Sequence, residues 1–207
     1  MTTLSGILDH KIVAILRGLA AKNVLPVADA LYAGGIRVLE VTLNSPEALT
    51  LIARLSDAFE GRMLIGAGTV LNTADAANAI AAGAAFLVSP TLDIDVIKTA
   101  RNAGVVGIPG AFTPTEILHA HNHGADIVKI FPAPDAGYVK NILAPLNHIR
   151  VMPVGGIDAS NIESFAATGA VAFGIGSALV NNASIINEKY LAELSQKARQ
   201  LINALNS

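Results

Sequence analysis

The sequence predicts an α/β protein with a (β/α)8 fold, the TIM barrel, as a single domain over residues 1–207. Eight short apolar runs rich in β-branched residues alternate with Ala/Leu-rich stretches that have helical spacing. The mean repeat of about 26 residues suits the short strand–helix units of a small barrel. Eight units favour a closed barrel over an open doubly wound sheet, which is the main alternative.

The strands are expected, in chain order, at residues 11–16, 36–43, 63–65, 85–88, 105–108, 127–131, 150–154 and 171–175. Continuous apolar runs indicate burial on both faces, as in a parallel sheet. Helices are expected at residues 24–32, 46–59, 74–81, 93–103, 114–121 and 159–167, and an amphipathic helix at 190–205. Several of them end in a glycine, which satisfies the last carbonyls of a helix in a left-handed conformation.

Composition excludes several classes of function. The net charge is −2, and the 14 lysines and arginines form no basic face, so nucleic acid is not expected as a partner. The absence of cysteine excludes disulfides, thiolate zinc sites and a cysteine nucleophile. The first residues lack the apolar core of a signal peptide, and no run approaches the ~20 residues of a membrane span. We therefore expect a cytoplasmic protein with no membrane partner.

Two charged residues interrupt the apolar strands. Lys129 lies in the run 127–131, where burial lowers the pKa of an amine, and a neutral amine is what attack on a ketone requires. Glu40 is a lone carboxylate in the run 36–43, and it could pass protons for such an amine at a shared barrel mouth. The alternatives are an edge lysine that reaches solvent and a buried ion pair that stabilises the barrel.

Polar groups also follow the first and third strands. Arg17 closes the first strand and could hold a carboxylate through two parallel hydrogen bonds, or it is an ordinary surface arginine. Residues 66–69 (Gly-Ala-Gly-Thr) follow the third strand, where the glycines permit close approach of a ligand and Thr69 offers a hydroxyl. This second signal is weak, because any tight loop favours glycine.

Glycine loops follow the seventh and eighth strands. They contain Gly155, Gly156, Gly176 and Ser177. Phosphate sites of TIM barrels recur at these two loops, where backbone N–H groups act as donors. The sequence therefore predicts a phosphate site here, with two ordinary turns as the alternative.

Three histidines, His119, His121 and His123, resemble a metal cluster by their spacing. They lie at the end of a predicted helix, on the side of the barrel away from its mouth. We interpret them as surface residues and expect neither a metal site nor a cofactor.

Seven segments resemble one family, in matching order over nearly the whole chain. They are AILRG (14–18), EVTLNSP (40–46), IGAGTVL (65–71), SP (89–90), KIFPA (129–133), GGI (155–157) and GIGSALV (174–180). The resemblance is to the bacterial 2-keto-3-deoxy-6-phosphogluconate / 2-keto-3-deoxy-6-phosphogalactonate aldolases. It implies a class I aldolase that is a homotrimer, needs no metal, and splits a phosphorylated keto sugar acid into pyruvate and D-glyceraldehyde 3-phosphate.

The resemblance also implies roles for the matching residues. Lys129 would form the Schiff base, and Glu40 would act as the general acid and base. The other matches are Arg17, Thr69 and Pro90 for the substrate carboxylate, Phe131 and Val154 for the pocket wall, and Gly155, Gly156, Gly176 and Ser177 for the phosphate.

The sequence does not decide between the possible substrates. Arg17, residues 44–46 and Val154 fit the phosphogalactonate type, whereas residues 134–137 depart from many relatives of either type. Cleavage of 4-hydroxy-2-oxoglutarate is an alternative activity. A phosphate-binding barrel isomerase or synthase does not explain Lys129 and Glu40 together, and a non-catalytic sugar-phosphate binder has no reason to keep them.

Overall fold

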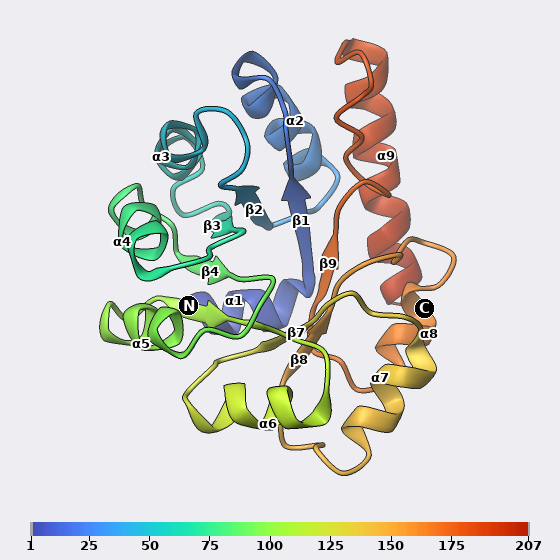
Figure 1. Cartoon of the computed structure of the whole chain (residues 1–207). Coiled ribbons are helices and arrows are strands. Elements are labelled where there is room, and N and C mark those ends of the chain that lie inside the picture. The colour runs from blue at the N-terminus through green and yellow to red at the C-terminus, as the bar shows by residue number, and fades with distance from the viewer. Residues whose placement is uncertain (1, 207) are drawn as a thin grey trace.

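A curled parallel sheet occupies the centre of the protein, and helices surround it (Figure 1). This computed structural model describes residues 2–206. The elements are α1 (Thr3–His10), β1 (Ile12–Leu16), α2 (Ala21–Ala33), β2 (Val38–Thr42), α3 (Ala48–Ala58), β3 (Leu64–Gly68), α4 (Thr73–Ala81), β4 (Phe86–Val88), α5 (Ile94–Asn102), β5 (Val106–Ile108), β6 (Gly110–Ala111), α6 (Pro114–Asn122), β7 (Val128–Ile130), α7 (Ala136–Leu143), β8 (Val151–Pro153), α8 (Ile162–Ala166), β9 (Phe173–Ile175) and α9 (Glu188–Leu205).

The strands form two hydrogen-bonded groups, in the orders β5-β4-β3-β2-β1-β9 and β6-β7-β8. Every pairing between these strands is parallel. Backbone contacts also join the two groups: the Asp126 N–H donates to the Gly107 carbonyl at 3.1 Å, and Val154 forms a parallel bridge with Gly174. The predicted α/β class with parallel strands is confirmed.

Alternation along the strands separates two apolar clusters. Inward-facing side chains, among them Val13, Phe86, Val106 and Met152, form an inner cluster. A larger outer cluster fills the space between the strands and the surrounding helices. Burial on both faces explains why the strands read as continuous apolar runs.

Helix α1 covers one end of the sheet and was not predicted from the sequence. Its Ile7 is completely buried in the inner cluster, with Leu4 and Leu8 packed beside it. The side chain of Thr2 caps the helix by accepting a hydrogen bond from the Ser5 N–H. Because α1 precedes β1, it lies at the amino-terminal end of the strands, and the carboxyl end is left for the loops.

Helix α7 was also absent from the prediction. It begins at the segment 134–137 that departs from the family pattern, where the side chain of Asp135 accepts a hydrogen bond from the Tyr138 N–H. Val139, Ile142 and Leu143 bury its apolar face. No helix within residues 2–206 is long and apolar enough to cross a membrane.

Candidate active site

Lys129 and Glu40 both lie inside the curled sheet. Lys129 is the middle residue of β7 and is 5% exposed, and Glu40 is the middle residue of β2 and is 1% exposed. Two residues before them in the chain lie Ile127 and Val38, which both belong to the inner cluster. Charged side chains this deep are rare in proteins unless they are paired or functional.

Gly68 makes the space that the Glu40 side chain occupies. A Cβ atom on Gly68 would lie 1.8 Å from Oε1 of Glu40, so no larger residue fits beneath the carboxyl group. The two strands are paired through Glu40 with Gly66 and Thr42 with Gly68. The second glycine of the Gly-Ala-Gly segment therefore serves the carboxyl group as well as the loop that follows.

The electrostatic setting shifts the pKa of both groups in the direction of their neutral forms. Burial lowers the pKa of Lys129 below its ordinary 10.5; the negative charge of Glu40 opposes this effect, and the positive charge of Arg17 adds to it. Burial raises the pKa of Glu40 above its ordinary 4.5, and the charges of Lys129 and Arg17 act against that rise. Desolvation thus favours a free amine and a protonated carboxyl group, and each charged form is stabilised by the other.

No direct contact ties the two groups together. Within residues 2–206, the only ion pairs are Lys98–Asp95 and Lys189–Glu193, both on the surface. Oε2 of Glu40 is buried and has no hydrogen-bond partner among the described residues. Lys129 and Glu40 are thus close enough to shift each other's pKa but too far apart for a hydrogen bond. A buried oxygen in this state is available for a ligand.

A hollow of about 370 Å³ opens beside this pair, at the carboxyl ends of the strands. Of the predicted site residues, its lining includes Arg17, Phe131, Val154, Gly155, Gly156, Gly176 and Ser177. Lys129 and Glu40 are not part of the lining. However, Nζ of Lys129 lies 4.6 Å from the centroid of the Phe131 ring, and Glu40 pairs in register with Ile15, which also lines the hollow. The structure thus brings the two glycine loops and Arg17 together next to the buried pair.

Thr69 and Pro90 lie outside this lining. Thr69 follows β3 with a φ of +42°, which is unusual for a β-branched residue, and strain of this kind clusters at functional sites. Pro90 follows β4, and its backbone packs so closely on Gly110 that a Cβ there would lie 2.4 Å from the Pro90 carbonyl. Both residues are at the carboxyl ends of their strands, as predicted.

Three polar residues at these loops were missed by the sequence reasoning. Asn182 follows β9 and lines the hollow. Thr42 and Ser45 are buried at the end of β2, and their hydroxyl groups lie 2.8 Å apart. The segment 44–46 was singled out only as a family pattern. A survey of polar residues at the end of every strand and in the loop that follows it would have found all three.

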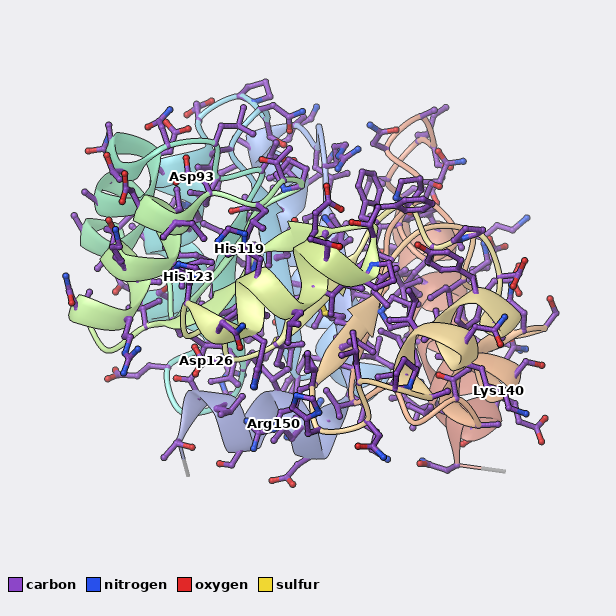
Figure 2. The ribbon with its side chains drawn as sticks, turned by 60° about the horizontal axis from the view of Figure 1, so that its bottom comes forward. Asp93, His119, His123, Asp126, Lys140 and Arg150 are labelled. Carbon is purple, nitrogen blue, oxygen red and sulfur yellow. The ribbon has the colours of Figure 1, made fainter. Side chains whose placement is uncertain are left out.

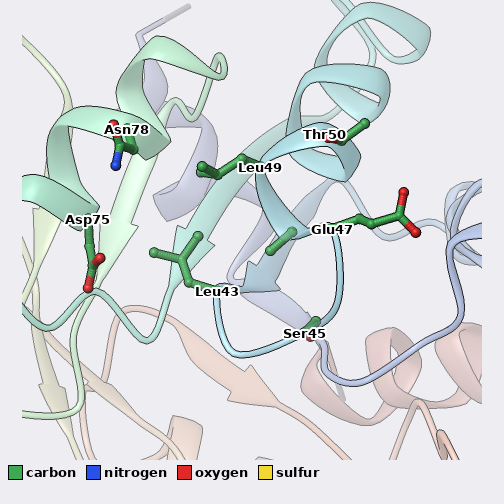
Figure 3. A pocket seen from close by; sticks show the side chains of 8 residues that line it. Leu43, Ser45, Glu47, Leu49, Thr50, Asp75 and Asn78 are labelled. Atoms are coloured by element: carbon green, nitrogen blue, oxygen red, sulfur yellow. The ribbon is translucent and has the colours of Figure 1, made fainter.

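The remaining candidate features lie elsewhere. The rings of His119 and His123 are 4.4 Å apart near the end of α6 (Figure 2), and His121 lies against His148. No group of three or more His, Cys, Asp or Glu residues in the described chain is arranged to hold a metal. A second hollow of about 340 Å³ lies between the starts of α3 and α4 (Figure 3).

A buried amine of lowered pKa, beside a buried carboxyl group at the carboxyl ends of parallel strands, is typical of enzymes that attack carbonyl compounds through lysine. The chain belongs to the KDPG and KHG aldolase family, whose model matches residues 5–196. It is therefore an aldolase, a carbon–carbon lyase.

Sequence and structure comparisons with individual proteins lead to the same family. The chain is 36% identical to a probable 2-dehydro-3-deoxy-6-phosphogalactonate aldolase of Rhizobium meliloti, over 91% of this chain and 92% of that protein. A solved structure described as native KDPGal superposes with a TM-score of 0.88 at 31% identity, covering 94% of each chain.

A third relative shows the covalent chemistry. The KDPG aldolase of Legionella pneumophila, solved with pyruvate captured as a covalent carbinolamine intermediate, superposes with a TM-score of 0.86 at 28% identity, covering 97% of this chain and 98% of that one. A Schiff-base mechanism is typical of the family.

Proposed function

We propose that this chain cleaves a 2-keto-3-deoxy-6-phospho sugar acid to pyruvate and D-glyceraldehyde 3-phosphate through a Schiff base on Lys129. The observation that carries the proposal is the buried amine with its lowered pKa, next to a carboxyl group that has an unpartnered oxygen. A phosphate-binding isomerase or synthase, or a non-catalytic binder, has no use for this pair.

The two groups suffice for the proposed reaction. The free amine of Lys129 attacks the C2 ketone, Glu40 passes protons to the carbinolamine oxygen, and water leaves to give the iminium ion. Glu40 then takes the C4 hydroxyl proton, the C3–C4 bond breaks, and its electron pair moves toward the iminium as the aldehyde departs. Protonation of the enamine at C3 and hydrolysis release pyruvate and restore the amine.

The proposed binding residues fall into two sets, one for each anionic end of the substrate. Gly155, Gly156, Gly176 and Ser177 are assigned to the phosphate, which is supported by their common hollow. Arg17, Thr69 and Pro90 are assigned to the carboxylate. Arg17 lines the hollow of the glycine loops, so its charge can act on either end. Holding both ends aligns the bond that breaks.

The preferred substrate is proposed to be 2-keto-3-deoxy-6-phosphogalactonate, with its epimer 2-keto-3-deoxy-6-phosphogluconate as the alternative. The support is Arg17, the segment 44–46 and Val154, which lines the hollow beside Phe131. Cleavage of 4-hydroxy-2-oxoglutarate is a second candidate, favoured by the family description. Comparison of kcat/KM for the three substrates decides between these possibilities.

We also propose that the strands close into one (β/α)8 barrel, that residues 1–207 form a single domain, and that the protein is a homotrimer. The Asp126–Gly107 hydrogen bond and the Val154–Gly174 bridge support closure, since they span both seams between the strand groups. Light scattering on the purified protein tests the trimer. The cytoplasmic location stays a prediction.

The decisive experiment is incubation with pyruvate and borohydride, followed by mass mapping of the labelled peptide. The expected result is a single reduced adduct on Lys129. No adduct, or an adduct on an exposed lysine such as Lys98, would remove the Schiff-base proposal. An undiminished rate of cleavage after chelation separates this mechanism from a metal-dependent aldolase.

A further inference from the structure

The loop after β2 contains a buried hydroxyl group that the proposed mechanism does not use. Ser45 lies between the end of β2 and the start of α3 (Figure 3) and is only 8% exposed. Its Oγ accepts a hydrogen bond of 2.8 Å from the backbone N–H of Gly18 and lies 2.8 Å from Oγ1 of Thr42. A serine hydroxyl thus joins two loops that are 27 residues apart in sequence.

Gly18 is the residue directly after Arg17, and its backbone turns sharply. Its φ is +64°, and a Cβ on it would lie 2.9 Å from Nδ2 of Asn182. The Gly18 backbone is therefore contacted by the Ser45 hydroxyl at its N–H and by Asn182, from the loop after β9, next to its Cα. Of these residues, Arg17 and Asn182 both line the hollow of the glycine loops.

The side chain of Arg17 has no such contacts of its own. It is exposed, and no hydrogen bond or ion pair engages its guanidinium group within residues 2–206. The backbone at residues 17 and 18 sets the point from which this side chain starts, and so how far the guanidinium group reaches into the hollow. A flexible backbone there would cost binding energy, because the guanidinium group would have to be ordered by the substrate.

We propose that Ser45 is a positioning residue: its hydroxyl fixes Gly18, and thereby holds the guanidinium group of Arg17 where it meets an anionic group of the substrate. The proposal rests on the proposed function of the hollow. The Thr42 hydroxyl contacts Ser45 from β2, the strand that carries Glu40. Ser45 therefore links the strand of the proton-transfer group to the loop of the anion site.

The first test is the kinetics of Ser45→Ala. The change removes one hydrogen bond from Thr42 at the end of β2, but it leaves the backbone pairing that holds Glu40 and does not reach Lys129 on β7. KM should therefore rise about tenfold while kcat stays within about twofold. Ser45→Thr keeps the hydroxyl and should restore KM. The matched control is Ser56→Ala, which removes a serine hydroxyl that donates to the Gly83 carbonyl, also 27 residues away, and it should leave KM unchanged.

A double-mutant cycle tests whether Ser45 acts through Arg17. In an Arg17→Ala background, Ser45→Ala should change KM by less than about twofold, because the side chain that it positions is gone. Equal effects of Ser45→Ala with and without Arg17 would show that the serine acts independently of the arginine, and would overturn the proposal.

A third test does not depend on turnover. Hydrogen exchange of the Gly18 amide should speed up in Ser45→Ala but not in Ser56→Ala, and the Kd for inorganic phosphate or for pyruvate should rise with it. Faster exchange with unchanged Kd values and KM would refute positioning while leaving the aldolase function intact. If the wild type failed to form a pyruvate adduct, the proposed aldolase function would be refuted. The hydrogen-exchange rates and the Kd for phosphate would still decide whether Ser45 positions Arg17.

Discussion

The two ends of the sheet interior are built from the same strands but differ in what faces inward. At the amino-terminal end, Val13, Val38 and Val106 close against Ile7 of α1 in an apolar cluster. At the carboxyl end, Glu40 and Lys129 replace apolar side chains, and Gly68 replaces any side chain at all. One end gains stability from burial, whereas the other end contains desolvated groups that shift each other's pKa. Substitutions at the carboxyl end should therefore lower activity, and those at the amino-terminal end should lower stability.

The largest expected effect is at the nucleophile. Lys129→Ala should lower kcat by about 10⁴-fold or more while the protein stays folded, because the amine is the only proposed route to the iminium ion. A coupled assay of pyruvate release and a thermal melt measure both quantities. The control is Lys140→Ala, an exposed lysine on α7, which should keep full activity. Normal turnover of Lys129→Ala would refute the mechanism.

The next effect concerns the carboxyl group. Glu40→Gln keeps the size of the side chain but removes its ability to exchange protons, so kcat should fall by about 10²–10⁴-fold. The pyruvate adduct on Lys129 should still form, more slowly, since the amine remains. Single-turnover trapping with borohydride distinguishes the two steps, and a wild-type kcat in this variant would exclude Glu40 as the acid and base.

The opposite end should respond in stability alone. Ile7→Ala removes a completely buried side chain from the inner cluster and should lower the free energy of unfolding by about 2–5 kcal/mol, with KM and kcat unchanged. Urea denaturation measures the change. Ile185→Ala is the control, because Ile185 is 83% exposed and its loss should change stability by less than about 0.5 kcal/mol. A loss of kcat in folded Ile7→Ala would contradict the division between the ends.

The smallest effect is a shift in pH dependence. Trapping of pyruvate on Lys129 should rise as pH rises through a midpoint below 10.5, because burial lowers the pKa of the amine. The charge of Glu40 opposes that lowering, so Glu40→Gln should move the midpoint to still lower pH. Peptide mass spectrometry against pH measures it, with the exposed Lys98 as an internal reference. A midpoint that moved upward would show that the two groups do not interact as described.

The sequence predicted what depends on local pattern. Continuous apolar runs located the strands, and a single charge inside such a run pointed to Lys129 and Glu40, because a buried charge is rare in a protein unless it is paired or functional. The Gly-Ala-Gly segment was noticed, but its contact with the Glu40 carboxyl group is a cross-strand relation that no local pattern contains.

What the sequence missed depends on which surfaces meet. The spacing of Leu4, Ile7 and Leu8 is helical, yet nothing in it says that this face closes the interior of the sheet. The bond from Gly18 to Ser45 joins loops far apart along the chain, and Asn182 reaches the same place from the last strand. Such contacts arise only once the strands are ordered side by side.

The unpartnered oxygen of Glu40 has a practical consequence for directed evolution. A desolvated acid without a partner lowers resistance to heat, so selection for thermal tolerance alone is expected to enrich apolar residues at position 40. Those clones would survive heating but would make pyruvate far more slowly. Any library built on this scaffold should therefore be screened for product and for heat resistance in the same round.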